Sequence, residues 1–415
     1  MLLQNNKNHN KLILWVLALA LFVRLGYVLT LGETLYWVDE YDYMAIGQSM
    51  AQGHGFATAD GEPTAFRPAG YPLLLAVLYH MGINTASDIR VVHVAFGVLT
   101  VMFVYLIALR LMRPPAALLA ALYAALYPYF VYLSGTVLAT SWFMVLLTAS
   151  MFYAMKGQSE HKIGFILLGG LLMGLAVLTR TSAAVLGAAI VLWIVLTMRT
   201  HMKKALLYGT LFSICMAIVV TPWILRNVQQ FGEPMLSSNG GRNLWLGNNP
   251  ESTINTGSNI EMPEPLATRI AAVSEVEADR IYTEEAEQFI RTHPQRFVLL
   301  TLKKGLSLWR FDPSPTTEGY DTLEPLYELA SVLSYAPIVL LAVVGYLVAS
   351  QKHREMMLVW LFFAVAFTAL HAVFIVKVRF RLPLDVFLII MAAYAVDHLL
   401  SRWTRLEGLV NSQES

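Results

Sequence analysis

Long apolar segments dominate this sequence and restrict it to a fold that crosses a lipid bilayer. A membrane-spanning helix needs roughly 20 predominantly apolar residues. Hydrophobic residues make up 57% of the 415-residue chain and charged residues only 14%, whereas soluble domains carry about 25% charged residues. The sequence therefore predicts an all-α, polytopic transmembrane helical bundle of about ten spans, at residues 12–31, 88–109, 116–133, 136–155, 163–179, 182–198, 205–224, 326–349, 356–376 and 382–400.

Basic residues indicate which connections face the cytoplasm, because cytoplasmic loops carry an excess of lysine and arginine. All the basic loops fall on the same side only if the apolar stretch 69–82 does not cross the membrane. This stretch is short for a span, so we expect it to lie at the interface or to re-enter the membrane. We therefore expect both termini inside. The basic residues assigned to this side are Lys7, Lys11, Arg110, Arg113, Lys156, Lys162, Arg199, Lys203, Lys204, Lys352, Arg354, Arg402 and Arg405.

Two long connections are then predicted on the outer side. The first covers residues 32–68 and belongs to an N-terminal membrane region, 1–224. The second covers 225–325 and precedes the C-terminal spans of 326–415. It holds a helical pattern over 274–297, followed by the basic and apolar stretch FVLLTLKKGLSLWRF. The spacing of this stretch is typical of a helix that lies in the membrane interface.

Three acids, Asp39, Glu40 and Asp42, follow the end of the first predicted span. There a carboxylate would face the headgroup of a lipid carrier. Transfer of a sugar from a lipid phosphate with inversion needs one carboxylate that deprotonates the acceptor hydroxyl. The alternative is that these are ordinary solvated acids, which are common near helix ends. The same acids are weak candidates for a divalent cation site, although no histidine is suitably spaced and no metal motif is convincing.

Basic residues also fall at the outer ends of predicted spans, where short loops normally avoid them. A charge near membrane depth costs about 2.5–3.5 kcal/mol on insertion scales, so its retention indicates a role. Guanidinium groups match phosphate oxygens in bidentate geometry. These side chains are candidate ligands of a lipid phosphate, with snorkelling to lipid headgroups as the alternative. They are Arg180, Arg226, Lys377, Arg379 and Arg381.

Several other polar residues suit a sugar or acceptor site. The stretch TAFRPAGYPLLLAVLY combines an arginine with aromatic residues and prolines where the chain re-enters the membrane, although an interface turn with an aromatic belt is equally consistent. The stretch NGGRNLWLGNNPES offers amides for sugar binding, although Gly and Asn clusters also punctuate loops. The candidate substrate-binding residues are His54, Arg67, Tyr71, Arg242, Asn243 and Asn248.

Composition and missing motifs exclude other classes. The single cysteine, Cys215, allows neither a disulfide framework nor a cysteine-rich metal site. A net charge of +1 gives no basic field for nucleic acid. Without a P-loop or a GxGxxG motif, use of a nucleotide sugar on a Rossmann-like domain is disfavoured. No Asn-x-Ser/Thr sequon occurs, which mildly favours a bacterial or archaeal source.

A set of motifs in this order resembles the GT-C class of membrane glycosyltransferases, especially the branch of the protein O-mannosyltransferases and the lipid A aminoarabinose transferase. The set begins with the acidic pair after the first span. The motifs that come after it are FRPAGYPLLLAVLY, ALYPYFVYLSGTVLATSWFMVLL, GLAVLTRTSA, TPWILRN, GRNLWLGNNP, HPQRFVLLTLKKGLSLWRF and VKVRFRLPLDVFLIIMAAYA. The resemblance implies a polyprenyl-phosphate sugar donor and Asp39 as general base, with Glu40 as helper. It also implies donor-phosphate ligands, namely Arg180, Lys377, Arg379 and Arg381.

Together these features predict a glycosyltransferase of the plasma (inner) membrane with its active site facing outward. It would transfer a sugar from a polyprenyl phosphate to a lipid, glycan or protein acceptor, with no certain cofactor. One alternative is a transporter or flippase of lipid-linked sugars, which would concentrate polar groups near the bilayer midplane. Another is a glycan ligase or polymerase. The charges of this sequence gather at one face, which favours the transferase over the transporter.

Overall fold

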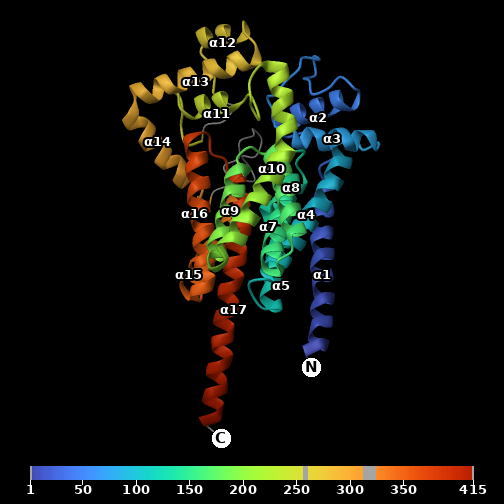
Figure 1. The fold of residues 1–415 in the computed structure, drawn as a ribbon, viewed down its shortest axis with the longest axis vertical. Helices are drawn as coiled ribbons and strands as arrows, with labels where there is room; N and C mark the ends of the chain where they lie inside the picture. Colours follow the sequence, from blue (N-terminus) through green and yellow to red (C-terminus); the bar gives the residue numbers. More distant parts are fainter. Residues whose placement is uncertain (1, 256–259, 312–323, 414–415) are drawn as a thin grey trace.

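The chain folds into a bundle of helices, shown in Figure 1 as a computed structural model that describes residues 2–255, 260–311 and 324–413. Within these residues the only β-type pairing is an isolated bridge between Ala57 and Pro63. The predicted all-α class is confirmed.

The helices are labelled along the chain in Figure 1. The N-terminal half contains α1 (Leu2–Val28), α2 (Val38–Ala51), α3 (Gly70–His80), α4 (Ala86–Ala108), α5 (Pro114–Leu126), α6 (Pro128–Ser134), α7 (Ala139–Glu160), α8 (Ile163–Thr179), α9 (Ala183–Thr197), η1 (Arg199–His201) and α10 (Met202–Phe231). The C-terminal half contains α11 (Gly240–Gly247), α12 (Glu264–Ala271), α13 (Glu275–Thr292), α14 (Pro294–Ser307), α15 (Glu324–Val348), α16 (Gln351–Val373), η2 (Val378–Phe380) and α17 (Leu382–Gln413).

Each predicted span coincides with a helix or, in one case, with a bent pair. In the described part of the chain, five helices are long and apolar enough to cross a bilayer, namely α1, α4, α10, α15 and α17. Helices α5 and α6 together form a sixth candidate, bent by 54°. Helices α8 and α9 are apolar but shorter. The chain is a multi-pass membrane protein, and the number of ten crossings stays a prediction.

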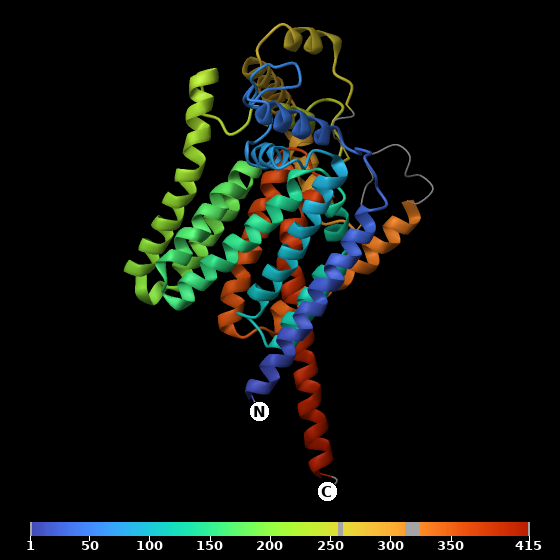
Figure 2. The same cartoon turned by 90° about the vertical axis from the view of Figure 1, so that its right-hand side faces the viewer.

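The apolar stretch 69–82 forms α3, which has 11 residues and is too short to cross a bilayer by itself. It packs closely on α2. A Cβ atom on Gly47 would lie only 2.7 Å from the Cβ of Leu75, so glycine allows this approach. Figures 1 and 2 show α2, α3 and α11 to α13 at one end of the bundle and both termini at the other. The two long connections therefore meet on one side.

A buried arginine accompanies the bend between α5 and α6. Pro128 has no N–H group, so the carbonyl oxygen of Ala124 loses its helical partner. Arg24 of α1 donates from Nη2 to this oxygen at 3.1 Å and from Nη1 to the carbonyl oxygen of Ala125 at 2.7 Å. A Cβ atom on Gly97 would come within 2.6 Å of Nε of Arg24, so α4 also depends on a small residue here. These contacts hold α1 against α5 and orient α6 toward the first outer loop.

Candidate active site

The start of α2 is organised by Glu40, which is fully buried. Its Oε2 accepts hydrogen bonds from the backbone nitrogens of Tyr36 and Trp37 at 2.6 and 3.0 Å, and its Oε1 accepts one from Val137 at 2.7 Å. A helix begins with N–H groups that lack partners, and a carboxylate three residues in commonly satisfies them. Glu40 therefore fixes the backbone of Asp39 and ties α2 to the segment before α7. Both carboxylate oxygens of the predicted catalytic helper thus accept backbone hydrogen bonds, and its catalytic role stays a prediction.

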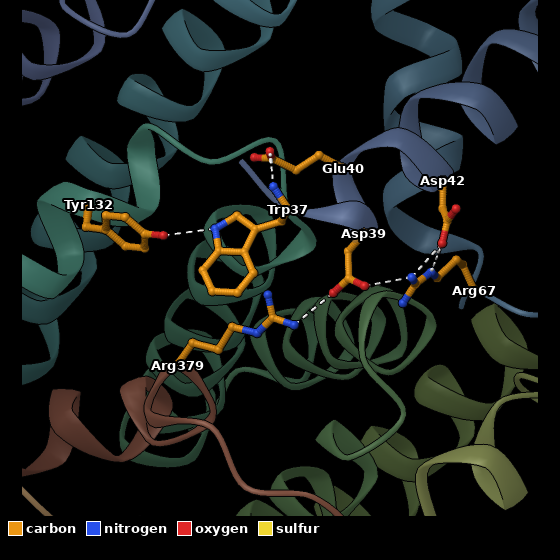
Figure 3. A network of polar contacts seen from close by, with 7 residues as sticks. All are labelled: Trp37, Asp39, Glu40, Asp42, Arg67, Tyr132 and Arg379. Carbon is orange, nitrogen blue, oxygen red and sulfur yellow. Dashed lines mark hydrogen bonds and ion pairs between the residues drawn. The ribbon is translucent and has the colours of Figure 1, made fainter. Parts of the chain in front are cut away.

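The carboxylate of Asp39 lies between two guanidinium groups (Figure 3). Nη2 of Arg67 donates to Oδ1 at 2.7 Å, and Nη2 of Arg379 donates to Oδ2 at 2.8 Å. Burial raises the pKa of Asp39, but the charges and hydrogen bonds of these arginines outweigh it and lower the pKa to about 2. Asp39 is therefore ionised at neutral pH and has both oxygens paired.

Arg67 also binds the third predicted acid. Its Nη2 and Nε donate to Oδ2 of Asp42 at 2.6 and 3.2 Å. Asp39 and Asp42 are three residues apart on α2, so their side chains project from the same face. The Arg67 guanidinium lies 5.3 Å from the ring centre of Tyr43 and 4.9 Å from that of Phe66. Arg67 is thus held by two carboxylates and two aromatic rings.

Arg379 reaches this cluster from the far end of the sequence. Its guanidinium lies 5.0 Å from the ring centre of Trp37, whose indole nitrogen donates to the hydroxyl of Tyr132 at 2.9 Å. Figure 3 shows Trp37 beside the Asp39–Arg379 pair. Nη1 of Arg379 is buried and makes no hydrogen bond among the described residues. A buried N–H group without a partner costs roughly 1–3 kcal/mol, and an anion entering here would satisfy it.

Arg180 and Lys377 add two cations beside Arg379. Arg180 lies 4.7 Å from the ring centre of Phe380, and its Nη1 is also buried and unpaired within the described residues. Lys377 donates to the carbonyl oxygen of Asn255 at 3.4 Å. Burial and the charges of two neighbouring arginines lower the pKa of Lys377 to about 8. The cluster thus joins one carboxylate to cations with unused hydrogen-bonding capacity.

A family model described as dolichyl-phosphate-mannose-protein mannosyltransferase matches residues 67–225. This range begins at Arg67 and runs through most of α10. A search of curated proteins finds no match.

Solved structures extend the likeness over the chain. The oligosaccharyltransferase AglB from Archaeoglobus fulgidus, in complex with an inhibitory peptide and a dolichol-phosphate, matches with a TM-score of 0.62 at 14% identity. The match covers 98% of this chain and 52% of AglB. The apo form of the Archaeoglobus fulgidus enzyme gives a TM-score of 0.59 at 14% identity, with 97% and 52% covered. This chain has the GT-C glycosyltransferase fold. It spans about half the length of those structures.

A weaker likeness is to ArnT from Cupriavidus metallidurans bound to undecaprenyl phosphate, with a TM-score of 0.46, 14% identity, and 93% of this chain and 78% of that one covered. The fold conclusion rests on the AglB structures and agrees with the resemblance stated from the sequence motifs.

Two basic residues predicted as phosphate ligands have structural partners in this GT-C fold. Arg226 donates to the carbonyl oxygens of Thr64 and Phe56 at 2.8 and 3.0 Å, and so holds the first outer loop against α10. Arg381 is fully buried, with Nε 3.2 Å from a carboxylate oxygen of Asp385 and Nη1 donating to the carbonyl oxygen of Arg310 at 2.8 Å. Both guanidinium groups hold buried acceptors, although Nη2 of Arg381 is buried without a hydrogen-bond partner among the described residues. Their role as donor ligands stays a prediction.

Two of the predicted substrate-binding residues are also buried in internal contacts. Nδ1 of His93 lies 2.7 Å from the carbonyl oxygen of Thr136, which can only accept, so Nε2 accepts from the hydroxyl of Tyr71 at 3.0 Å. Asn248 is fully buried and donates to the carbonyl oxygens of Leu244 and Val373, both at 2.8 Å. Tyr71 and Asn248 therefore make internal contacts, and their role in substrate binding stays a prediction.

Four predicted substrate-binding residues remain, and they lie in different places. The guanidinium of Arg242 lies 5.5 Å from the ring centre of Phe66, at the edge of the Arg67 cluster. Asn243 is half-buried on α11, and His54 is exposed in the first outer loop. Arg67 is the one member of this group that contacts Asp39, as an ion-pair partner.

Sequence reasoning missed two residues of this region. Tyr43 stands four residues after Asp39, which places both on one face of α2, and that spacing was the available signal. Burial raises the pKa of its hydroxyl, while the charges of Arg67, Arg379 and Arg180 oppose this shift. Lys304 is the second residue of the pair Lys303–Lys304 in α14, and the sequence pattern did not separate its role from that of Lys303.

The predicted weak cation site is not assembled in the described residues, where no three His, Cys, Asp or Glu side chains lie close enough to hold a metal ion. Asp39 and Asp42 both face Arg67, whereas Glu40 faces backbone nitrogens.

Proposed function

We propose that this chain transfers a sugar from a polyprenyl-phosphate donor to a hydroxyl group of a lipid, glycan or protein acceptor, with inversion. The observation that carries the proposal is the position of Asp39 beside Arg379 and Arg180. Each arginine has a buried N–H group that is unpaired among the described residues. A base and a set of free phosphate ligands are the two parts that this reaction needs. The AglB structure contains a dolichol-phosphate, and the ArnT structure contains undecaprenyl phosphate.

In the proposed reaction the acceptor oxygen attacks the anomeric carbon from the face opposite the phosphate. The bond between the anomeric carbon and the phosphate oxygen breaks, and its electron pair stays on that oxygen. Asp39 takes the acceptor proton as the new glycosidic bond forms. Because the polyprenyl phosphate gains negative charge, Arg379, Arg180 and Lys377 stabilise the transition state more than the ground state.

Arg379 has two roles in this scheme. In the free protein it pairs with Oδ2 of Asp39. A donor phosphate competes for the same guanidinium and draws it away, which leaves Oδ2 free to accept the acceptor proton. Arg67 stays on Oδ1 and keeps the carboxylate oriented, while Asp42 balances the charge of Arg67. The base is therefore exposed only when a donor is bound, and this arrangement limits transfer of the sugar to water.

We place this site at the outer face of the plasma membrane. The reason is that the basic loops, both termini and the outer helices are distributed as the positive-inside rule requires. A lipid carrier would present its phosphate at the level of α2, with its tail along the bundle.

The function is tested with purified protein in lipid nanodiscs and a synthetic polyprenyl-phosphate sugar. Mass spectrometry follows transfer to added lipid, glycan or peptide acceptors and the release of polyprenyl phosphate. Transfer by the wild-type protein and its loss in Asp39→Asn are expected. Movement of intact lipid-linked sugar across proteoliposomes, without transfer, would establish a transporter instead. Transfer of whole oligosaccharides would indicate a ligase.

A further inference from the structure

Lys304 is a buried cation on the amphipathic helix α14. Helix α14 exposes Val298, Leu302 and Leu306, each more than half exposed, on one side. Lys304 lies on the opposite side with only 1% of its surface exposed. Isolated buried charges are strongly unfavourable, so such a group needs a full set of partners. Burial lowers the pKa of Lys304 to about 8.

The ammonium group finds these partners on two other elements. Nζ donates to the carbonyl oxygens of Phe374, Gly247 and Val373 at 2.7, 3.1 and 3.3 Å. An ammonium has three N–H donors, so all of them are used. Val373 and Phe374 mark the end of α16, where carbonyl groups lack helical partners and carry partial negative charge. Gly247 is the last residue of α11.

The same junction is closed by a second side chain and a close backbone approach. Asn248 donates to the carbonyl oxygen of Val373 at 2.8 Å. A Cβ atom on Gly247 would lie 2.3 Å from the carbonyl oxygen of Phe374, so a larger residue would push the elements apart. Helices α11, α14 and α16 therefore meet at the point where the segment that carries Lys377 and Arg379 begins.

We propose that Lys304 is a positioning residue for the donor phosphate, because it anchors the start of the segment 374–381 to the outer helices α11 and α14. This inference rests on the proposed function. Arg381 anchors the other end of the segment, since its Nη1 donates to the carbonyl oxygens of Leu308 and Arg310 at 3.3 and 2.8 Å. With both ends fixed, Arg379 is held within reach of Asp39. An acceptor that shifts α11 or α14 would move the same segment, which couples the outer helices to the phosphate site.

The test compares Lys304→Met with Lys303→Met in nanodiscs. Methionine keeps the length of the side chain but cannot donate to the three carbonyl oxygens. Lys303 is exposed on the same helix, so its variant is a matched control. We expect Lys304→Met to weaken the binding of polyprenyl phosphate by about tenfold to a hundredfold. A loss of this size is typical when a residue that contacts the ligand is misplaced. Its KM for the donor should rise more than its kcat falls. Lys303→Met should bind normally.

Hydrogen–deuterium exchange provides a second readout. Lys304→Met should exchange faster over residues 374–381 and unchanged over α2, and Lys304→Arg should restore part of the donor affinity. Equal donor affinity in Lys304→Met and wild type overturns the proposal, even if the melting temperature falls. Should Lys304→Met not fold, Asn248→Ala decides, with weaker donor binding expected and normal binding refuting the coupling. Absence of polyprenyl-phosphate binding in the wild type would instead refute the proposed function.

Discussion

Replacing Asp39 by asparagine should separate turnover from donor binding. Asparagine keeps the shape of the side chain and an oxygen that accepts from Arg67, but it does not take a proton at neutral pH. General-base catalysis contributes roughly 10²- to 10⁴-fold, so turnover should fall by about that factor. The lost charge has a second effect, because Arg379 no longer has an ionic partner in the free protein.

The size of this second effect follows from the site. Burial raises the pKa of Asp39, yet the two arginines lower it from 3.8 to about 2. A shift of one pKa unit corresponds to about 1.4 kcal/mol, so the net preference for the charged form is roughly 2 kcal/mol. Because the two guanidinium groups also offset the effect of burial, Arg379 accounts for at least about half of this preference, on the order of 1 kcal/mol. The donor phosphate must overcome this amount, so Asp39→Asn should bind polyprenyl phosphate about fivefold more tightly.

Equilibrium binding of radiolabelled polyprenyl phosphate to purified protein in nanodiscs measures this gain, and the transfer assay measures turnover. Asp42→Asn is the matched control. Asp42 pairs with Arg67 and lies three residues further along α2, so its variant should keep wild-type donor affinity and lose less turnover. Full activity of Asp39→Asn would refute the base assignment. Unchanged or weaker donor binding in this variant would refute the exchange of Arg379 between Asp39 and phosphate.

Three further predictions test the surroundings of the site. Arg379→Gln should weaken polyprenyl-phosphate binding about tenfold to a hundredfold, since a charge-assisted hydrogen bond is worth roughly 1.5–3 kcal/mol; normal binding would leave lipid snorkelling as its role. Because the pKa of Lys377 is lowered to about 8, its ammonium loses a proton as the pH rises through about 8. The kcat/KM for the donor should fall there, and Lys377→Arg should move the fall to higher pH; a fall that stays in place would have another origin. Reporter fusions after residues 60, 158, 260 and 352 should read outside, inside, outside and inside. If the fusion after residue 260 reads as cytoplasmic, the outer helices and Asp39 lie on opposite sides of the membrane and the site is refuted.

Much of the fold could be predicted because its causes are local. Apolar length specifies a membrane helix, and all ten predicted segments are helical. The pattern over 274–297 predicted α13, since the repeat of apolar residues on one helix face is visible in a short window. The short stretch 69–82 forms the 11-residue helix α3, and its placement at the interface or re-entering the membrane stays a prediction. Local chemistry also pointed to Asp39, an acid that follows the first span, and to Arg379, a cation at an outer helix end. The two residues are 340 positions apart in the sequence.

Only the tertiary structure decided which partners each candidate charge has. Glu40 is adjacent to Asp39 and has the same chemistry, yet three backbone nitrogens occupy its carboxylate. Arg381 stands two residues from Arg379, yet it pairs with Asp385. The sequence does not distinguish Lys304 from its neighbour Lys303, and only the structure shows that three carbonyl oxygens bind its ammonium group. The role of a charged side chain depends on which unpaired backbone groups lie beside it, and these groups are brought together where helix ends from distant parts of the sequence meet.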